Sequence, residues 1–420
     1  MKLKHQFLPH RLPNYLKKAL FAFSGLLVAL LLCELLLAIF IPQKTFNKIY
    51  KDANRCWVGE TDMLFSLKPN CSYALKNEDF SVRVNINGQG MRGAEAVLPK
   101  PENTVRLIVT GDSFIFGNGL KEENTFPNLL GDALGKYRIF GEKTVEVINA
   151  GYGGGFSPDA HLIYLRKLIA RGYQPDIVIM SVFVGNDFFD MADNVWIGSA
   201  DFSSPKGVKS AKFLVTKDGL LINTASDRSG VWGNSFLRNS HLAVFLNKNL
   251  EPVFQKFGQR FFGNKPDVIF SEPTDSDYSA AHAYKCIFGD QCHRKTGNLF
   301  GDLLAVIKAA QSAVDAVSTI EPNFLVLLIP ADFQVQRGYA DKYGKSVDNF
   351  AKAVDEPDPQ PQKRIRELLI REGIPYLDLL PGLRRNSQNA LYFVNDGHLN
   401  ELGAQVAADE ARQWIARNTY

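Results

Sequence analysis

The residues that form an activated serine nucleophile occur in two short segments, one early and one late in the chain. Ser113 ends the segment Val105–Ser113, whose apolar run breaks at Gly-Asp-Ser, and His398 ends the segment Asn395–His398. A neutral serine hydroxyl needs a base within hydrogen-bond reach, and a carboxylate orients that base. We therefore expect Ser113 to act as nucleophile, His398 as general base and Asp396 as the carboxylate that holds the imidazole.

His398 is the histidine that best suits the role of base. The other six precede a long apolar segment, fall in a predicted helix or lie in an irregular region: His5, His10, His161, His241, His282 and His293. His398 belongs to a late loop that can fold back over the ends of the strands. Asn395 is the alternative to Asp396. Ser113 has a simpler alternative role as the cap of a turn, and we expect Asp112 to position that turn.

Apolar strands and helices alternate around these segments. Strands are expected at residues 105–110, 145–149, 176–184, 324–329 and 376–379. Helices are expected at residues 125–134, 158–170, 298–319, 363–372 and 401–417, with Ser157 as N-cap and Pro158 at the first position of the second helix. Continuous apolar strands that alternate with helices predict a parallel sheet with helices on both faces.

Two regions fall outside this alternation. Residues 43–100 form a lead-in segment, with an alternating strand at Phe80–Ile86 before a turn-forming cluster. Residues 190–297 form an insertion that contains a hairpin of residues 213–222 and an amphipathic run from Phe236 to Phe254. We expect the insertion to cover the sheet edge or the site.

The segment of residues 19–41 is long and apolar enough to cross a bilayer as a single span. Its 23 residues would extend about 35 Å as a helix. We expect an uncleaved membrane anchor, and a cleaved signal sequence is the alternative. Glu34 is unfavourable in lipid unless it faces a partner helix or is protonated.

The cysteines favour an oxidising compartment for most of the chain. Four of the five form two local pairs, Cys56 with Cys71 and Cys286 with Cys292. An even count at short spacings is typical of disulfides in exported domains. The zinc alternative has only His293, beside Cys292, in its favour. Because basic residues flank both ends of the span, the disulfides decide the orientation: residues 1–18 in the cytoplasm and the rest facing the periplasm or the exterior.

The charge distribution argues against a nucleic-acid-binding protein. The formal net charge is +4, and residues 1–18 carry five basic and no acidic side chains, so the remainder sums to −1. A nucleic-acid-binding domain of this size would show a strongly basic face.

Four short blocks resemble those of the SGNH/GDSL hydrolase superfamily. They are Gly111–Phe114, Asn149–Gly154, Gly185–Asp187 and Asp396–His398. The similarity covers residues of about 105–190 and 320–417, and the single span together with Arg92 looks like the membrane-anchored bacterial members. The resemblance implies a flavodoxin-like three-layer α/β/α parallel sheet, with residues 101–420 as the catalytic domain and 190–297 as an inserted lid region.

The resemblance also implies the remaining parts of an acyl-transfer site. The amides of Ser113 and Gly154 and the side chain of Asn186 would form an oxyanion hole. No metal or organic cofactor is implied. As alternatives, Asn186 caps a helix, and the glycines near Gly154 permit a tight turn or, less consistently with their spacing, bind a nucleotide. Asp187 and Arg92 are expected to be structural.

The activity that the resemblance implies is that of a serine esterase acting on an acylated cell-envelope glycan or lipid. The commonest spacing in the superfamily is Asp-x-x-His, whereas this chain has Asp396-Gly397-His398. The shorter spacing occurs in SGNH-like enzymes that move acetyl groups on bacterial polysaccharides. O-acetyl transfer to a cell-envelope polysaccharide is therefore the first alternative, and a non-catalytic envelope scaffold is the second.

Overall fold

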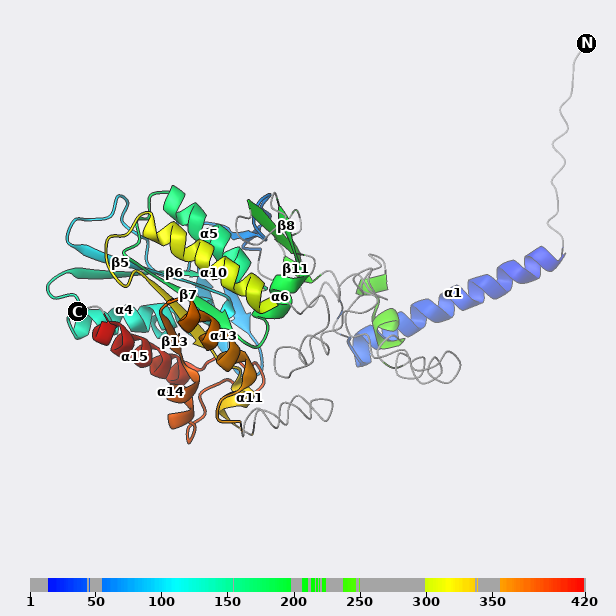
Figure 1. Cartoon of the computed structure of the whole chain (residues 1–420). Coiled ribbons are helices and arrows are strands. Elements are labelled where there is room, and N and C mark those ends of the chain that lie inside the picture. Colours follow the sequence, from blue (N-terminus) through cyan, green and yellow to red (C-terminus); the bar gives the residue numbers. More distant parts are fainter. Residues whose placement is uncertain are drawn as a thin grey trace, which may run out of the picture. The chain divides into compact units, whose positions relative to one another are not determined.

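The computed structural model of the chain forms two compact units (Figure 1). The smaller unit combines Met1–Asp52 with Ala225–Ile269, and the larger combines Ala53–Thr224 with Phe270–Tyr420. The structure describes residues 14–43, 45, 55–153, 155–197, 206–210, 213–215, 217, 219, 221–223, 237–246, 249, 299–336, 338 and 356–418. Each unit is described below by itself.

A five-stranded parallel sheet forms the centre of the larger unit. Its strands are β5 (Thr104–Gly111), β6 (Thr144–Gly151), β7 (Ile177–Phe183), β12 (Phe324–Ile329) and β13 (Tyr376–Asp378). They lie in the order β13-β12-β7-β5-β6, and every neighbouring pair is parallel. Counted along the chain this order is 2-1-3-4-5, the flavodoxin-like arrangement. The predicted fold class is confirmed.

Helices cover both faces of this sheet, as Figure 1 shows. One face packs against α5 (Pro158–Ala170), α10 (Leu299–Asp315) and α13 (Gln360–Arg371). The other face packs against α4 (Phe126–Lys136), α14 (Leu380–Arg385) and α15 (Glu401–Asn418). Alternate residues of one strand supply the two cores: Val326 and Leu328 point to the first, and Leu325 and Leu327 to the second. A strand buried on both faces must be apolar throughout, which explains the continuous runs in the sequence.

Shorter helices complete the larger unit. They are α3 (Ser113–Phe116), η1 (Glu122–Asn124), α6 (Asp187–Asp193) and α11 (Asp332–Val335). Ser157 and Pro158 begin α5 as predicted, but the hydroxyl of Ser157 makes no capping bond to the helix backbone. It donates instead to the buried carboxylate of Asp159 at 2.5 Å.

The lead-in segment contains more regular structure than the sequence predicted. Its two antiparallel pairs are β1 (Trp57–Val58) with β2 (Ser66–Leu67), and β3 (Ser72–Lys76) with β4 (Ser81–Asn85). Only the second strand of the β3–β4 hairpin was expected. The predicted Cys56–Cys71 disulfide is confirmed and closes the loop that precedes β3. Cys286 and Cys292 lie outside the described residues.

The insertion is described in part. The expected hairpin is present as β10 (Phe213–Val215) and β11 (Leu221–Asn223). A second antiparallel pair, β8 (Asn194–Ile197) with β9 (Gly207–Ser210), was not predicted. Both strands of this pair are four residues long, and such short strands leave little periodicity in a sequence.

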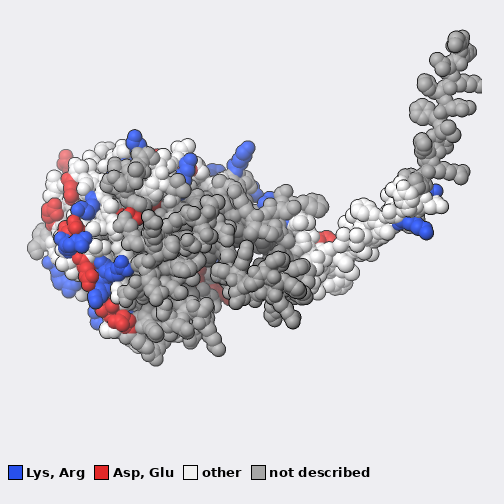
Figure 2. Space-filling view, turned by 45° about the vertical axis from the view of Figure 1, so that its right-hand side comes forward, with Lys and Arg blue, Asp and Glu red and all other residues white. Residues whose placement is uncertain are grey.

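The smaller unit contains the apolar helix α1 (Asn14–Phe40), which would extend about 40 Å. An 18-residue window within it has a mean hydropathy of 2.6 and is fully exposed, so its length and composition suit a membrane span or a signal sequence. Figure 2 shows α1 as an almost uncharged rod, whereas the described surface of the larger unit intersperses both signs of charge.

Glu34 is the exception within α1, and its carboxylate is fully engaged. It accepts from Ser240 Oγ at 2.7 Å, from His241 N at 2.7 Å and from Leu242 N at 2.8 Å. These donors begin the helical turns of residues 241–246, which follow η2 (Leu237–Asn239) in the amphipathic run. Of the two possibilities for Glu34, contact with a partner helix is the one that these helical turns of the insertion provide.

Candidate active site

The carboxyl end of β5 places Ser113 at the topological switch point of the sheet. The next strand along the chain, β6, lies on one side of β5, and the one after it, β7, lies on the other side. The order of strands therefore reverses at β5. Ligands of open α/β sheets bind at such points. Gly111 makes the turn compact, since a Cβ there would lie 2.2 Å from Ile115 Cγ1 and 2.3 Å from Ser181 Oγ.

The structure brings the three predicted residues into one hydrogen-bonded chain. Nε2 of His398 lies 2.6 Å from Oγ of Ser113. Nδ1 of the same ring contacts Oδ1 of Asp396. With the ring proton on Nδ1, the imidazole donates to the carboxylate and Nε2 accepts from the serine hydroxyl. This is the geometry in which histidine can remove the proton of a serine.

The loop that carries Asp396 and His398 is folded tightly on itself. Phe393 N donates to His398 O at 2.8 Å, and Gly397 N donates back to Phe393 O at 3.0 Å. Gly397 adopts a φ of +84°, in the left-handed region that favours glycine. This residue turns the backbone between the acid and the histidine, so that their side chains meet at a spacing of two residues.

Aromatic contacts fix the plane of the imidazole from the nucleophile side. The ring of Phe114 lies 4.8 Å from that of His398, centroid to centroid, and 4.2 Å from that of Phe183. Phe114 is buried, so its ring is held in place by the core. The residue that follows Ser113 therefore also contacts and orients the ring of His398.

Asp112 caps the short helix that Ser113 begins, in agreement with the positioning role expected for it. Its Oδ1 accepts from Phe114 N at 3.0 Å, whereas Oδ2 is buried without a hydrogen-bond partner. Burial raises the pKa of Asp112 to about 7, and the nearby His398 opposes part of that rise. Burial and the proximity of Asp112 also raise the pKa of Asp187. A negative charge on Asp112 therefore makes ionisation of Asp187 less favourable.

The predicted oxyanion hole is described only in part. Ser113 lies at the first position of α3. The side-chain Nδ2 of Asn186 donates to Asp190 Oδ2 at 3.0 Å, and Oδ1 is buried without a partner. Asn186 occupies the N-cap position of α6 but makes no side-chain capping bond. Gly154 lies outside the described residues, so the oxyanion roles stay a prediction.

Arg92, which belongs to the lead-in segment, supports the turn that carries Ser113, here called the nucleophile turn. Its buried guanidinium donates to the carbonyl oxygens of Phe116 at 2.9 Å, Gly117 at 2.6 Å and Leu120 at 2.5 Å. These carbonyls end α3 and begin the loop after it, where backbone acceptors have no helical partner. Arg92 therefore has the structural role that was expected.

Two residues that the sequence analysis missed support the acid/base loop. Asn77 Nδ2 donates to Asp396 Oδ2 at 2.9 Å. Asp79 accepts from the backbone amides of Asn395 at 2.8 Å and Asp396 at 2.7 Å. Both belong to the turn of the β3–β4 hairpin. The three residues Asn-Glu-Asp directly precede the alternating strand, and nothing in them signals a partner more than 300 residues away.

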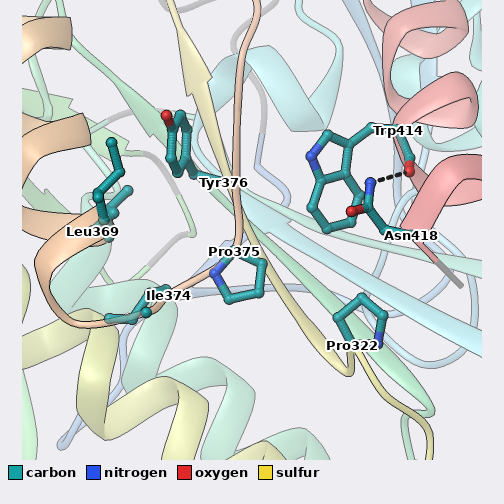
Figure 3. Close-up of a pocket in the computed structure, with 9 residues that line it drawn as sticks. Pro322, Leu369, Ile374, Pro375, Tyr376, Trp414 and Asn418 are labelled. Carbon is teal, nitrogen blue, oxygen red and sulfur yellow. Dashed lines mark hydrogen bonds between the residues drawn. The ribbon is translucent and has the colours of Figure 1, made fainter.

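A groove of about 460 Å³ lies at the amino ends of the strands, whereas Ser113 lies at their carboxyl ends (Figure 3). Its lining includes Pro322 before β12, Pro375 before β13, Tyr376 at the start of β13 and Trp414 of α15. Asn418 Nδ2, also in its lining, donates to Trp414 O at 2.7 Å. The groove has no nucleophile in its lining and is separate from the triad.

His161 is a buried histidine of the larger unit that lies outside the triad. Burial lowers the pKa of His161 to about 3, so this histidine is neutral within the core. Among the described residues, no group of three or more His, Cys, Asp or Glu side chains is placed to hold a metal ion.

Comparisons with known proteins give distant structural likenesses only. No protein-family model and no curated protein sequence matches the chain. An α/β hydrolase from the metagenome of Lake Arreo superposes with a TM-score of 0.35 at 12% identity, covering 74% of this chain and 94% of that one. A lipase/acylhydrolase from Enterococcus faecalis gives 0.34 at 13%, covering 74% and 96%. A lipolytic protein of the G-D-S-L family from Veillonella parvula gives 0.33 at 10%, covering 74% and 97%.

The fold and the candidate chemistry follow from the chain's own strand order and side-chain contacts. Its sheet has the flavodoxin-like strand order, its serine follows the first strand of that sheet, and its late histidine and aspartate reach the serine. In the order of its motifs and in the arrangement of its side chains, the chain resembles the SGNH/GDSL hydrolases.

Proposed function

We propose that the chain is a serine esterase that works through an acyl-enzyme on Ser113. The observation that supports this most directly is the continuous hydrogen bonding from Ser113 Oγ through His398 to Asp396. A structural serine has no need of a histidine that is itself oriented by a carboxylate. The three groups come from the first strand and from the C-terminal part of the chain, so chance proximity along the sequence does not explain their meeting.

The reaction would proceed in two steps. Ser113 Oγ attacks the ester carbonyl while His398 Nε2 takes the hydroxyl proton, and Asp396 stabilises the imidazolium. The tetrahedral intermediate expels the alcohol, which takes the proton from His398, and leaves the acyl group on Ser113. Water then attacks the acyl-enzyme with His398 again acting as base. Ser113 N, Gly154 N and Asn186 Nδ2 are the donors that we assign to the developing oxyanion.

Labelling with a fluorophosphonate tests this assignment without knowledge of the substrate. The full-length chain in detergent should be modified on Ser113, as mapped by mass spectrometry, and should cleave a chromogenic acetyl ester. Ser72→Ala is a matched control, because Ser72 is an exposed serine of the β3–β4 hairpin. Modification of a different serine, or no modification at all, would exclude the proposed nucleophile.

We propose an acylated glycan or lipid of the cell envelope as the substrate class. Support comes from the exposed apolar helix α1, which suits a single-pass anchor in the inner membrane, and from the disulfide, which favours an oxidising compartment for the larger unit. An uncleaved anchor predicts that the mature protein retains residues 14–40. Intact mass measurement of the protein purified from membranes tests this, and a mature chain that starts after α1 would contradict it.

O-acetyl transfer is the second candidate, and the Asp396–His398 contact favours it. The acid stands two residues before the histidine and still contacts it. This is the spacing that the resemblance associates with acetyl transfer on polysaccharides. Incubation of the acyl-enzyme with a candidate glycan acceptor separates the two activities: transfer yields an acetylated glycan, whereas hydrolysis yields only acetate.

A further inference from the structure

The turn of the β3–β4 hairpin, residues 77–80, is built around one asparagine. Asn77 Oδ1 accepts from Asp79 N at 2.8 Å and from Phe80 N at 3.0 Å. The backbone of Asn77 donates to Phe80 O at 3.0 Å and closes the hairpin. The side-chain oxygen of Asn77 is thus committed to its own turn, as in other Asx turns.

The same side chain directs its other end to the candidate acid. Asn77 Nδ2 lies 2.9 Å from Asp396 Oδ2, while the remaining oxygen, Oδ1, faces the imidazole of His398. Each carboxylate oxygen therefore has a donor of its own. A carboxylate held at both oxygens cannot rotate about its terminal bond, so the plane that it presents to the histidine is fixed.

Asp79 holds the backbone of the acid/base loop at the point where the acid emerges. Its carboxylate accepts from Asn395 N at 2.8 Å, from Asn395 Nδ2 at 2.8 Å and from Asp396 N at 2.7 Å. Hydrogen bonds to an ionised carboxylate are stronger than bonds between neutral groups. Three of them onto two consecutive residues fix the position of Asp396 as well as its orientation.

Aromatic packing adds a contact between the same two loops. The ring centroids of Phe80 and Phe393 lie 5.0 Å apart. Gly119, which follows the nucleophile helix, faces both rings, since a Cβ at this residue would lie 2.6 Å from an atom of each. The hairpin turn, the acid/base loop and the segment after Ser113 therefore pack together at one place.

From these contacts we propose that Asn77 and Asp79 are positioning residues of the catalytic site. They act through Asp396 and fix the orientation and tautomer of His398. The β3–β4 hairpin of the lead-in segment thus contributes to catalysis by positioning the acid. This rests on the proposed function, because it assigns a role to residues that touch the triad without touching the substrate.

The test measures the rate of Ser113 labelling by a fluorophosphonate as a function of pH, together with kcat and KM for a chromogenic acetyl ester. Asn77→Asp keeps the acceptor that shapes the turn and replaces the donor to Asp396 with a carboxylate. Asn85→Asp is the matched control, since it adds the same charge at the open end of the same hairpin. β4 separates the turn from the open end of the hairpin by about 13 Å.

We expect Asn77→Asp to move the midpoint of the rising rate–pH profile upward by about one unit, because an added negative charge favours the protonated, inactive imidazolium. Asn77→Ala and Asp79→Asn should each lower kcat about 10-fold and leave KM unchanged. The Asn85→Asp protein should match the wild type in midpoint and kcat. Partial unfolding would lower the labelling rate by the same factor at every pH and leave the midpoint of the profile unchanged. A shift of the midpoint therefore distinguishes an effect on His398 from a loss of stability.

The outcomes distinguish this inference from the proposed function. If the wild-type protein neither labels on Ser113 nor cleaves the ester, the esterase itself is wrong. If the wild-type protein is active and all three variants behave like Asn85→Asp, the esterase stands and the positioning role of the hairpin is overturned.

Discussion

The nucleophile turn and the acid/base loop are both supported by the lead-in segment, but in opposite ways. Around Ser113 the support from the lead-in segment is buried, because Arg92 donates to three carbonyl oxygens, and the neighbouring Asp112 caps the same helix. Around His398 the support is near the surface, where exposed Asn77 and half-buried Asp79 bind the loop. The position of the nucleophile is thus coupled to the stability of the fold. The orientation of the acid and base depends on contacts that can change while the fold persists.

The largest effect that this comparison predicts is the loss of activity on removing the nucleophile. Ser113→Ala should lower the turnover of a chromogenic ester by at least about 10⁴-fold, because no other group can form the acyl-enzyme. The thermal midpoint should stay within a degree or two of the wild-type value, since the hydroxyl contributes one half-buried hydrogen bond. Retained turnover in this variant would show that the chemistry occurs elsewhere.

The next effect separates the two candidates for the acid. Asp396→Asn should lower kcat about 10³- to 10⁴-fold, because an amide cannot hold the imidazole in the tautomer that accepts the serine proton. Asn395→Ala should lower kcat about 10-fold at most, since Asn395 contacts Asp79 and not the ring. A reversal of this order would transfer the role of acid to residue 395.

Asp112 predicts a pH dependence of stability on the nucleophile side. Its pKa in the folded chain is raised to about 7, so the folded state binds an extra proton between about pH 4 and pH 7. Stability from this group is present at low pH and is lost as the pH rises through that window. Asp112→Asn should flatten the curve of unfolding free energy against pH, measured by urea denaturation from pH 4.5 to 8.5. An unchanged slope would argue against a buried neutral carboxyl group.

The smallest effect compares two arginines of the lead-in segment. Arg92→Met should lower the free energy of unfolding by about 3 kcal/mol, because three carbonyl oxygens lose a buried donor. Arg83→Met should change it by less than about 0.5 kcal/mol, since Arg83 is exposed and, among the described residues, donates to Ser72. Chemical denaturation measures both. Equal losses of unfolding free energy in the two variants would mean that the buried contacts of Arg92 contribute no more to stability than the exposed contact of Arg83.

The sequence was sufficient to predict the sheet and to place the candidate residues at its edge, because both leave local signals. Buried parallel strands are continuous apolar runs, and Ser113 and Asn186 each follow such a run. A polar residue directly after a buried strand falls at the carboxyl edge of the sheet, so the approximate position of these side chains follows from the strand pattern alone.

The support for the reacting groups left no comparable signal. Asn77 and Asp396 are 319 residues apart, and an asparagine in a hairpin turn is explained by the turn itself. Likewise, Ser157 satisfies the pattern of an N-cap, yet its hydroxyl binds Asp159, because a buried carboxylate gains more from a donor than the start of a helix does. Local patterns identify what a residue can do, and tertiary contacts decide which of these roles it takes.

The carboxylate of Glu34 links two stretches of chain that are more than 200 residues apart. Any form of the protein that starts after Phe40 loses the acceptor for Ser240, His241 and Leu242 at once. Three polar groups would then need water in place of a fixed anion at the start of residues 241–246. Soluble versions made by trimming the apolar helix would accordingly differ from the intact protein at a second location, deep within the insertion.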